Sequence, residues 1–306
     1  RLPPGHYRFT ASIPGIGHAE LLRTFEAGPR THALQARIHD ASARAIPLVD
    51  IPTGNLRLVP QKQVGCLWLR QRTLDVPAFR LGRTEVSNGE FVDYLAAASR
   101  AGWPAAEPPA NWVALGFDPI LGLAESAETL ESWRNLPVVG MSLDDARGYA
   151  EWHGLRLPMH TELEYAMAGA DEGVGEWTPG DDVDGQPLAN VLGATASFAT
   201  SDREAGYRLY LENAASVFDE RFEQEPFGLL HAHGNVSELS ESPLTEPVAN
   251  RVSLMSEDHV VIGSYYGSAA DGLALHTHGR SGVESYYYRV QTGFRLAASD
   301  FTESKR

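Results

Sequence analysis

The sequence predicts a fold of the α+β class, because helical patterns and strand patterns occupy separate stretches of the chain. Two helical patterns, over residues 142–154 and 161–169, are separated by a tight Arg-Leu-Pro turn. An earlier stretch, 87–102, repeats this pattern, and alternation of apolar and polar residues near the N-terminus indicates a β-hairpin.

Each predicted helix has a start signal. Ser142 is followed three residues later by Asp145, and Thr161 is followed in the same way by Glu164. A hydroxyl at the N-cap and a carboxylate at the third helical position both accept hydrogen bonds from free backbone N–H groups. We therefore expect helices to begin directly after Ser142, Thr161 and Ser87.

The first 50 residues predict a small β-rich module. Apolar residues alternate with polar ones up to a Pro14-Gly15 turn, and they are Tyr7, Phe9, Ala11 and Ile13. Further apolar runs over 33–38 and 46–49 favour a small β-sandwich that ends near Asp50. Pro47 confines the last strand to the edge of a sheet, because proline has no N–H to donate.

Composition excludes two classes of partner. The formal net charge of −15 over 306 residues argues against nucleic acid, which requires clustered Lys and Arg. No apolar run approaches the ~18 residues of a membrane span.

No signal peptide is visible, which favours a cytoplasmic protein, although the chain opens at Arg1 and a truncated N-terminus would leave export open. Because Lys62 and Lys305 are the only lysines, the composition indicates a GC-rich, thermophilic bacterium.

The order of residues within 142–169 carries a resemblance. Residues 145–158 read Asp-Ala-x-x-Tyr-x-x-Trp-x-Gly-x-Arg-Leu-Pro, which is similar to the signature of the formylglycine-generating enzyme and sulfatase-modifying-factor family. Further stretches resemble that family's motifs in the family's own order, namely 83–91, Asn190-Val191, 227–238, 263–265 and 293–296.

This resemblance covers residues 50 to 298, and it implies a C-type-lectin-like α+β fold rich in irregular loops. The chain then divides into the β-sandwich-like module over 1–50, the C-type-lectin-like domain over 51–300, and a tail over 301–306. The Pro-Gly-x-Tyr opening of the module resembles a β-module found in bacterial proteins with an upstream kinase-like region. A regulatory module attached to a kinase is therefore one alternative function.

The residues that would carry the family's oxidative chemistry are missing. The enzyme holds copper with two cysteines, and counting from the flanking motifs places these at Gly267 and Gly272. The only cysteine, Cys66, lies beside Leu67 and Trp68 and is interpreted as a buried structural thiol. We therefore expect no copper and no catalytic residues, with a formylglycine-generating oxidoreductase as the alternative.

The resemblance also implies calcium sites. The family's Asn-Val-Trp-Glu turn offers oxygen ligands to a hard cation, and its counterparts here are Asn235, Val236 and Glu238. A weaker second set consists of Asn190, Val191 and Glu204. The alternative is purely structural, in which the asparagine and the glutamate cap a turn.

The last part of the domain has the composition of a binding face. Tyrosine, serine and histidine cluster within residues 264–288, where Tyr supplies contact area and Ser and Gly supply adaptable hydrogen bonds. Three consecutive tyrosines cannot all face one core, because successive strand side chains alternate. The predicted ligand-binding residues are Tyr265, Tyr266, Ser268, Asp271, His276, His278, Ser281, Glu284, Tyr286, Tyr287 and Tyr288.

This segment resembles the variable region of proteins diversified by retroelements, which use the same fold and end in Gly-Phe-Arg. The resemblance implies a non-catalytic protein that binds a protein or another macromolecule through the variable face at 264–288. The structural alternative is a pair of strands with aromatic cross-strand contacts and no binding role. A template repeat and a reverse-transcriptase gene beside the coding sequence would separate the diversified protein from its alternatives.

Overall fold

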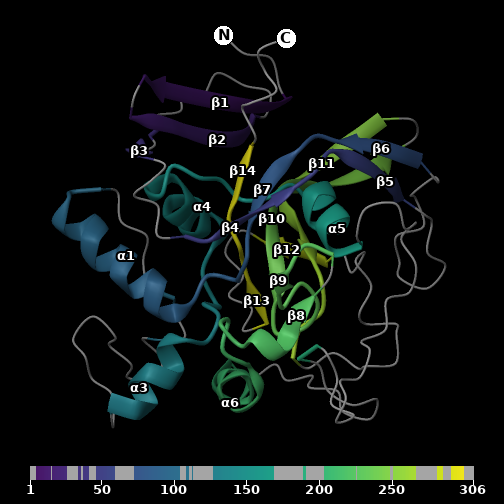
Figure 1. Cartoon of the computed structure of the whole chain (residues 1–306). Coiled ribbons are helices and arrows are strands. Elements are labelled where there is room, and N and C mark those ends of the chain that lie inside the picture. Colours follow the sequence, from purple (N-terminus) through teal and green to yellow (C-terminus); the bar gives the residue numbers. More distant parts are fainter. Residues whose placement is uncertain are drawn as a thin grey trace.

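The computed structural model describes the parts of the chain that hold the helices and strands named below (Figure 1). These parts are residues 5–14, 16–25, 34–35, 37–40, 46–58, 72–103, 108–109, 112, 127–168, 189–190, 203–224, 226–248, 251–266, 281–284 and 291–299.

The N-terminal hairpin predicted from the alternating residues is confirmed. Its three-stranded sheet has the order β1-β2-β3, with strands β1 (Gly5–Ile13), β2 (Gly17–Phe25) and β3 (His39–Asp40). The expected strand over 33–38 is not formed by the described residues 34, 35, 37 and 38. Of the described strands of the module, those up to Asp40 form this one sheet, whereas the predicted strand at 46–49 joins a sheet of the larger domain rather than a second layer of a sandwich.

A second three-stranded sheet joins the beginning and the end of the larger domain. Its order is β14-β7-β4, with strands β4 (Leu48–Ile51), β7 (Phe79–Gly82) and β14 (Ala297–Ser299). Strand β4 lies at the edge, as Pro47 predicts, and a boundary at residue 50 falls inside it. Beside this sheet, β5 (Gly54–Leu58) and β6 (Arg72–Val76) form a separate antiparallel pair.

The described helices are α1 (Asn88–Arg100), α3 (Ala127–Arg134), α4 (Leu143–Trp152), α5 (His160–Ala168) and α6 (Arg203–Asn213). The predicted starts of two of them are confirmed, because complete capping boxes join Ser87 to Glu90 and Ser142 to Asp145. Gly154 follows α4 with a φ of +65°, a left-handed conformation that glycine adopts without steric cost.

The predicted start of α5 at Thr161 is wrong, because the helix begins at His160. The carboxylate that accepts the free N–H is that of Glu162, at 2.8 Å from the Met159 nitrogen, rather than that of Glu164. The reason is a tertiary contact, since Arg156 holds the same Glu162 carboxylate through two nitrogen atoms at 2.6 and 2.7 Å. Local capping rules do not include such a contact.

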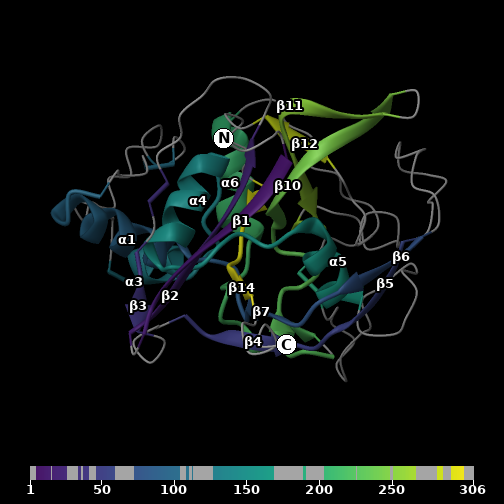
Figure 2. The same cartoon turned by 90° about the horizontal axis from the view of Figure 1, so that it is seen from above.

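The sheet that leads into the predicted binding face has the order β12-β11-β10-β13. Its strands are β10 (Ser237–Val248), β11 (Arg251–Ile262), β12 (Ser281–Glu284) and β13 (Thr292–Gly293). The β10–β11 ribbon extends away from the body of the molecule (Figure 2). Before it, a 3-10 turn over Glu220–Phe222 precedes the short pair β8 (Glu223–Gln224) and β9 (Leu229–Leu230).

The larger core joins α1, α4 and the segment after β13 through aromatic rings. Phe91 stacks on Tyr149 with 5.7 Å between ring centroids, and Phe294 meets both rings edge-on. All three side chains are at most 1% exposed. The Phe of the Gly-Phe-Arg motif is thus a core residue placed next to the buried Arg295.

The N-terminal sheet packs against the C-terminal end of α4. Ala19 lies against Gly154, Arg23 pairs with Glu151, and the Arg37 guanidinium lies 4.2 Å from the centroid of the Trp152 ring. In Figure 1 the strands β1 and β2 lie next to α4. Within the described parts of the chain, no helix is both long enough and apolar enough to cross a membrane.

Candidate functional site

Residues 234–238 form a buried turn at the start of β10, which we name the anchoring turn. Gly234 and Asn235 have φ values of +87° and +57°, a left-handed pair that directs backbone groups toward neighbouring segments. The Asn235 Oδ1 atom accepts hydrogen bonds from the Ala215 nitrogen at 2.9 Å and from Asn190 Nδ2 at 3.1 Å. Its Nδ2 atom donates to Glu85 Oε2 at 2.6 Å, so the amide is fully engaged.

An ion pair beneath the turn holds it in place. Arg295 is 0% exposed, and its Nε atom donates to both Glu238 oxygen atoms at 2.7 and 2.8 Å. Its terminal nitrogens donate to the carbonyl oxygens of Gly82 and Leu230 at 3.0 and 3.1 Å. Burial raises the pKa of the Glu238 carboxyl, and the Arg295 charge opposes this shift.

Glu85 adds a second buried carboxylate to this cluster. It is 0% exposed, accepts a hydrogen bond from Asn235, and lies 3.2 Å from the Val236 nitrogen. Burial raises its pKa well above the ordinary value, the Arg295 charge lowers it, and the neighbouring Glu238 raises it further. The charge of the Arg295 guanidinium therefore opposes the rise in pKa of both buried carboxyl groups, Glu85 and Glu238.

Both ends of the predicted binding face are bound to the anchoring turn. At the start, Gly234 donates from its N–H to Ser264 Oγ at 3.0 Å, and Tyr266 donates to the Asn235 carbonyl at 2.8 Å. At the end, Ser237 donates to the Gln291 carbonyl at 2.9 Å. Strand β13 then pairs in parallel with Ser237 and Glu238. Residues 267–290 thus enter and leave at neighbouring positions of one buried turn.

The structure corrects one of the predicted ligand-binding residues. Tyr266 is only 2% exposed, because its ring packs against Tyr210 at 6.2 Å and its backbone is held by Asn235. Tyr266 is therefore not part of an exposed face, whereas the adjacent Tyr265 is partly exposed. Burial raises the pKa of both tyrosines, and Tyr265 is the less deeply buried of the two.

The remaining predicted ligand-binding residues stay predictions. Ser281 and Glu284 lie at the two ends of strand β12, whose side chains are not described. Seven others lie outside the described residues, namely Ser268, Asp271, His276, His278, Tyr286, Tyr287 and Tyr288. The positions that matter for copper, Gly267, Gly272 and Cys66, also lie outside them.

The residues of the predicted calcium site at Asn235, Val236 and Glu238 do not fit a calcium ion. Both Glu238 oxygen atoms are bound by Arg295, and the Asn235 oxygen already accepts two hydrogen bonds. A hard cation requires free oxygen ligands and would lie beside a buried guanidinium. Across the described part of the chain, no three His, Cys, Asp or Glu side chains form a group that would hold a metal ion.

The weaker set stays a prediction. The Asn190 Nδ2 atom donates to the Asn213 carbonyl and to Asn235, and the Asn190 carbonyl accepts from the Asn235 nitrogen. Val191 lies outside the described residues, and the Glu204 side chain is not described. The described contacts of Asn190 are therefore those of a residue that supports the anchoring turn.

Two buried histidines precede the turn and were not assigned a structural role from sequence. The His231 and His233 rings each bond a backbone carbonyl through Nε2, that of Ser216 at 2.9 Å and that of Met167 at 3.3 Å. Burial lowers both pKa values to about 4, while these carbonyls oppose the shift. Through Nε2 the two rings therefore bond different segments of the chain.

Helix α6 is a further support that the sequence analysis missed. Tyr207 and Tyr210 are at most 1% exposed, and the Tyr210 hydroxyl donates to the Pro137 carbonyl at 2.6 Å. Asn88 Nδ2 donates to the same hydroxyl at 3.0 Å. The signal was the spacing of three residues between the two tyrosines, which places both on one helix face beneath Tyr266.

Sequence comparison finds one family across most of the chain. Residues 38–300 match the family described as the sulfatase-modifying factor enzyme 1-like domain. Hercynine oxygenase of Mycobacterium tuberculosis is 34% identical over 109 residues, which is 31% of this chain and 24% of that protein. The chain thus matches about a quarter of the length of that curated relative.

Solved structures with the same fold come from two kinds of protein. PvdO from Pseudomonas aeruginosa superposes with a TM-score of 0.54 at 18% identity, over 83% of this chain and 94% of that chain. Treponema denticola variable protein 1 superposes with a TM-score of 0.52 at 14% identity, over 96% of this chain and 99% of that chain.

The mixed helices and sheets, closed around a buried Gly-Phe-Arg arginine, define a C-type-lectin-like fold of the formylglycine-generating-enzyme type. With the match over residues 38–300, the chain belongs to the sulfatase-modifying factor family.

Replacing Glu238 with Gln should lower the free energy of unfolding by about 3–5 kcal/mol, because Arg295 would remain buried without the carboxylate that it binds directly. Denaturant titration should show the same loss in calcium and in chelator, since the carboxylate is bound by Arg295. As a control, Glu223→Gln, which breaks a partly exposed pair with Arg83, should cost less than ~1 kcal/mol. A loss seen only in calcium-containing buffer would contradict this account.

Acidification from about pH 6.5 to about pH 4 should destabilise the protein through His231 and His233. Their folded pKa values of about 4 lie below the ordinary 6.5, so the unfolded chain binds more protons throughout this window. Each histidine should contribute up to about 1.4 kcal/mol per pH unit. Glu85 and Glu238 contribute with the opposite sign, because their raised pKa values let the folded state bind protons first.

The histidine contribution is isolated by the variants His231→Asn and His233→Gln. Asn tolerates the left-handed backbone at His231, where φ is +52°. Unfolding free energies of wild type and variants, measured as a function of pH, should show a shallower acid slope for each variant. Measurements above about pH 8, where histidine is neutral in both states, give the loss due to contacts alone. Parallel slopes would show that neither ring controls acid stability.

Proposed function

We propose that this chain is a non-catalytic ligand-binding protein that presents residues 267–290 as a diversified segment, like the variable proteins of diversity-generating retroelements. The observation that carries the proposal is the attachment of both ends of the segment to one anchoring turn. A segment fixed at neighbouring points can change its side chains while its entry and exit stay in place.

The composition of the segment supports this role. Its Tyr, Ser, His and Gly residues are those with which binding loops combine large contact area and adaptable hydrogen bonding. Tyr265, partly exposed and packed edge-on against the buried Tyr266, would provide a fixed aromatic contact at the rim of the face. The ligand is a protein or another macromolecule.

The extent of the structural matches supports the same proposal. The match to PvdO covers 83% of the chain, whereas the match to the Treponema variable protein covers 96%. The longer match takes in more of this chain than the match to PvdO does. That likeness concerns the fold, and the proposed binding role rests on the anchored segment.

Randomising the codons of Ser268, Asp271, His276, His278, Tyr286, Tyr287 and Tyr288 in the full chain should leave most variants folded. Surface substitutions usually change stability by less than ~0.5 kcal/mol each. Thermal melting of individual variants measures this, with Phe294→Ala and Trp152→Ala as core controls that should each cost roughly 3–5 kcal/mol. If most segment variants melt as low as the controls, the segment belongs to the core and the proposed face is lost.

The second candidate is an oxidoreductase of the formylglycine-generating type, which the identity with hercynine oxygenase favours. Against it stand the glycines at the positions of the copper-binding cysteine pair, Gly267 and Gly272.

The Cys66→Ser variant should therefore bind no stoichiometric Cu(I), and the wild type should not oxidise a cysteine-containing sulfatase peptide. Titration with Cu(I) against a competing chelator and mass spectrometry of the peptide are the two measurements. Stoichiometric Cu(I) binding by Cys66→Ser, or conversion of the peptide cysteine, would establish the enzymatic alternative.

A further inference from the structure

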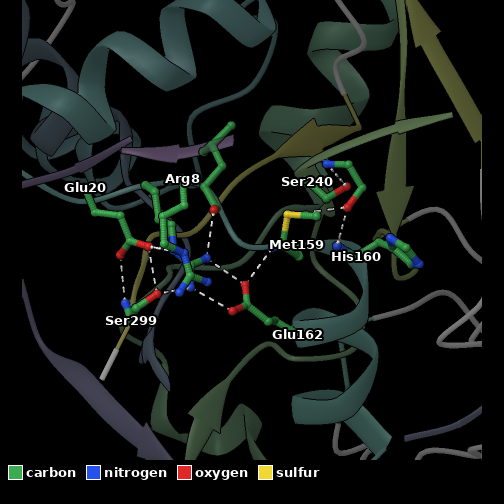
Figure 3. Close-up of polar contacts among 10 residues, drawn as sticks. Arg8, Glu20, Met159, His160, Glu162, Ser240 and Ser299 are labelled. Carbon is green, nitrogen blue, oxygen red and sulfur yellow. Dashed lines mark hydrogen bonds and ion pairs between the residues drawn. The ribbon is translucent and has the colours of Figure 1, made fainter. Parts of the chain in front are cut away.

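One buried carboxylate joins the N-terminal sheet to the last strand of the domain. Glu20 in β2 is 1% exposed, and its Oε2 accepts a hydrogen bond from the Ser299 nitrogen at 3.0 Å. Its Oε1 accepts from Ser299 Oγ at 2.7 Å and lies 2.9 Å from Arg8 Nε and 3.2 Å from Arg156 Nε. Figure 3 shows Glu20 pointing toward Ser299 and Arg8.

Glu20 completes the hydrogen bonding along one edge of β14. On one side, β14 pairs with β7 in antiparallel register. On the other side, Ala297 exchanges two backbone hydrogen bonds with Arg156 at 2.8 and 3.0 Å, and Glu20 then takes the Ser299 N–H. The second edge of this three-residue strand is thus completed by a side chain from the N-terminal sheet.

The fixed strand is continuous with the anchor of the proposed binding segment. Arg295 lies four residues before Ser299 and is paired with Glu238 of the anchoring turn. Immediately before it, Thr292 and Gly293 pair with the turn, and the Gln291 carbonyl accepts the Ser237 N–H. A shift of β14 along its axis would therefore move the point at which the segment returns to the domain.

The charges around Glu20 form a balanced chain. Arg8 and Arg156 carry positive charges, Glu20 and Glu162 carry negative charges, and each carboxylate has an arginine partner. Removing the charge of Glu20 leaves Arg156 paired with Glu162 through two hydrogen bonds. Glu20→Gln thus replaces one of the two oxygen atoms that accept from Ser299 by an NH2 donor, without leaving the buried arginine unpaired.

We propose that Glu20 is a positioning residue for the proposed binding segment: by holding Ser299, the N-terminal sheet fixes β14 and thereby the C-terminal anchor of the segment at residues 291–293. This inference rests on the proposed function for the identity of the segment. Its physical content, a coupling between Glu20 and the Ser237 hydrogen bond, is measured without any ligand.

Amide hydrogen exchange on the full chain tests the coupling. In Glu20→Gln, the Ser299 amide should exchange faster, and the Ser237 amide, which is bound to Gln291, should also exchange about ten-fold faster. Ser299→Ala, which keeps the backbone donor and loses the hydroxyl, should give the same pattern with a smaller effect. If Glu20→Gln speeds Ser299 while Ser237 is unchanged, the sheet holds β14 only locally and the proposal is overturned.

Two control variants separate coupling from general loss of stability. Arg8→Gln removes the partly exposed partner of Glu20 and should leave both amides at wild-type rates. Leu95→Ala, in the core of α1, should lower the melting temperature without changing the local exchange of Ser237. Equal acceleration of Ser237 in Leu95→Ala would overturn the proposal.

The wild-type protein provides a second measurement should Glu20→Gln not fold. In native-state exchange at increasing denaturant, the Ser299 and Ser237 amides should open in one cooperative step, with a common denaturant slope and a common free energy below that of global unfolding. Independent opening of the two amides contradicts the proposal. A tolerant segment with uncoupled amides would refute only the role of Glu20, whereas coupled amides with an intolerant segment would refute only the binding function.

Discussion

The pairing of Arg295 with Glu238 is the interaction on which the rest of the domain depends. Burying two charges is expensive, and it is sustained only when their remaining hydrogen-bonding groups are satisfied. Arg295 meets this condition by binding carbonyls that come from segments far apart in sequence, those of Gly82 and Leu230. One side chain therefore fixes the end of β7, the end of β9 and the start of β10 relative to one another.

Features set by local chemistry were predictable from the sequence, and features set by distant contacts were not. The capping boxes at Ser87 and Ser142 need only residues three positions apart. The predicted start of α5 was misplaced because Arg156 binds Glu162. The role of Glu20 was not predicted because its partner, Ser299, is 279 residues away in the sequence. The family motifs located the anchoring turn, but they suggested free oxygen ligands where Arg295 occupies the carboxylate.

The alternation argument concerned Tyr286, Tyr287 and Tyr288, which lie outside the described residues, and it does not decide the burial of Tyr265 and Tyr266, which follow the end of β11. It predicts that neighbouring side chains point to opposite sides, but it does not say which side is buried. That choice is made by Tyr207 and Tyr210 of α6, a helix whose pattern is recognised once its place beneath Tyr266 is known. The deciding contacts join residues more than 50 positions apart.

The docking of the N-terminal sheet follows from the electrostatics of helix α4. The C-terminal end of a helix carries partial negative charge, which favours nearby cations. Two arginines lie at this end: Arg23 pairs with Glu151, and the Arg37 guanidinium lies over the Trp152 ring. The backbone nitrogen of Arg37 also donates to the Glu151 carbonyl at 3.1 Å. Strands β1 and β2 precede the start of the family match at residue 38, yet the contacts of this sheet are those of an integral layer.

The burial of Tyr266 next to the partly exposed Tyr265 has a consequence for how this gene tolerates mutation. A process that rewrites a block of codons acts on neighbouring codons alike, whereas the fold treats these two tyrosines differently. Substitutions at codon 265 change a side chain at the surface, while substitutions at codon 266 empty a space beside Tyr210 that the core must then fill. For the proposed binding segment, packing therefore requires that a diversified block leave codon 266 unchanged, even though codon 265 would tolerate change.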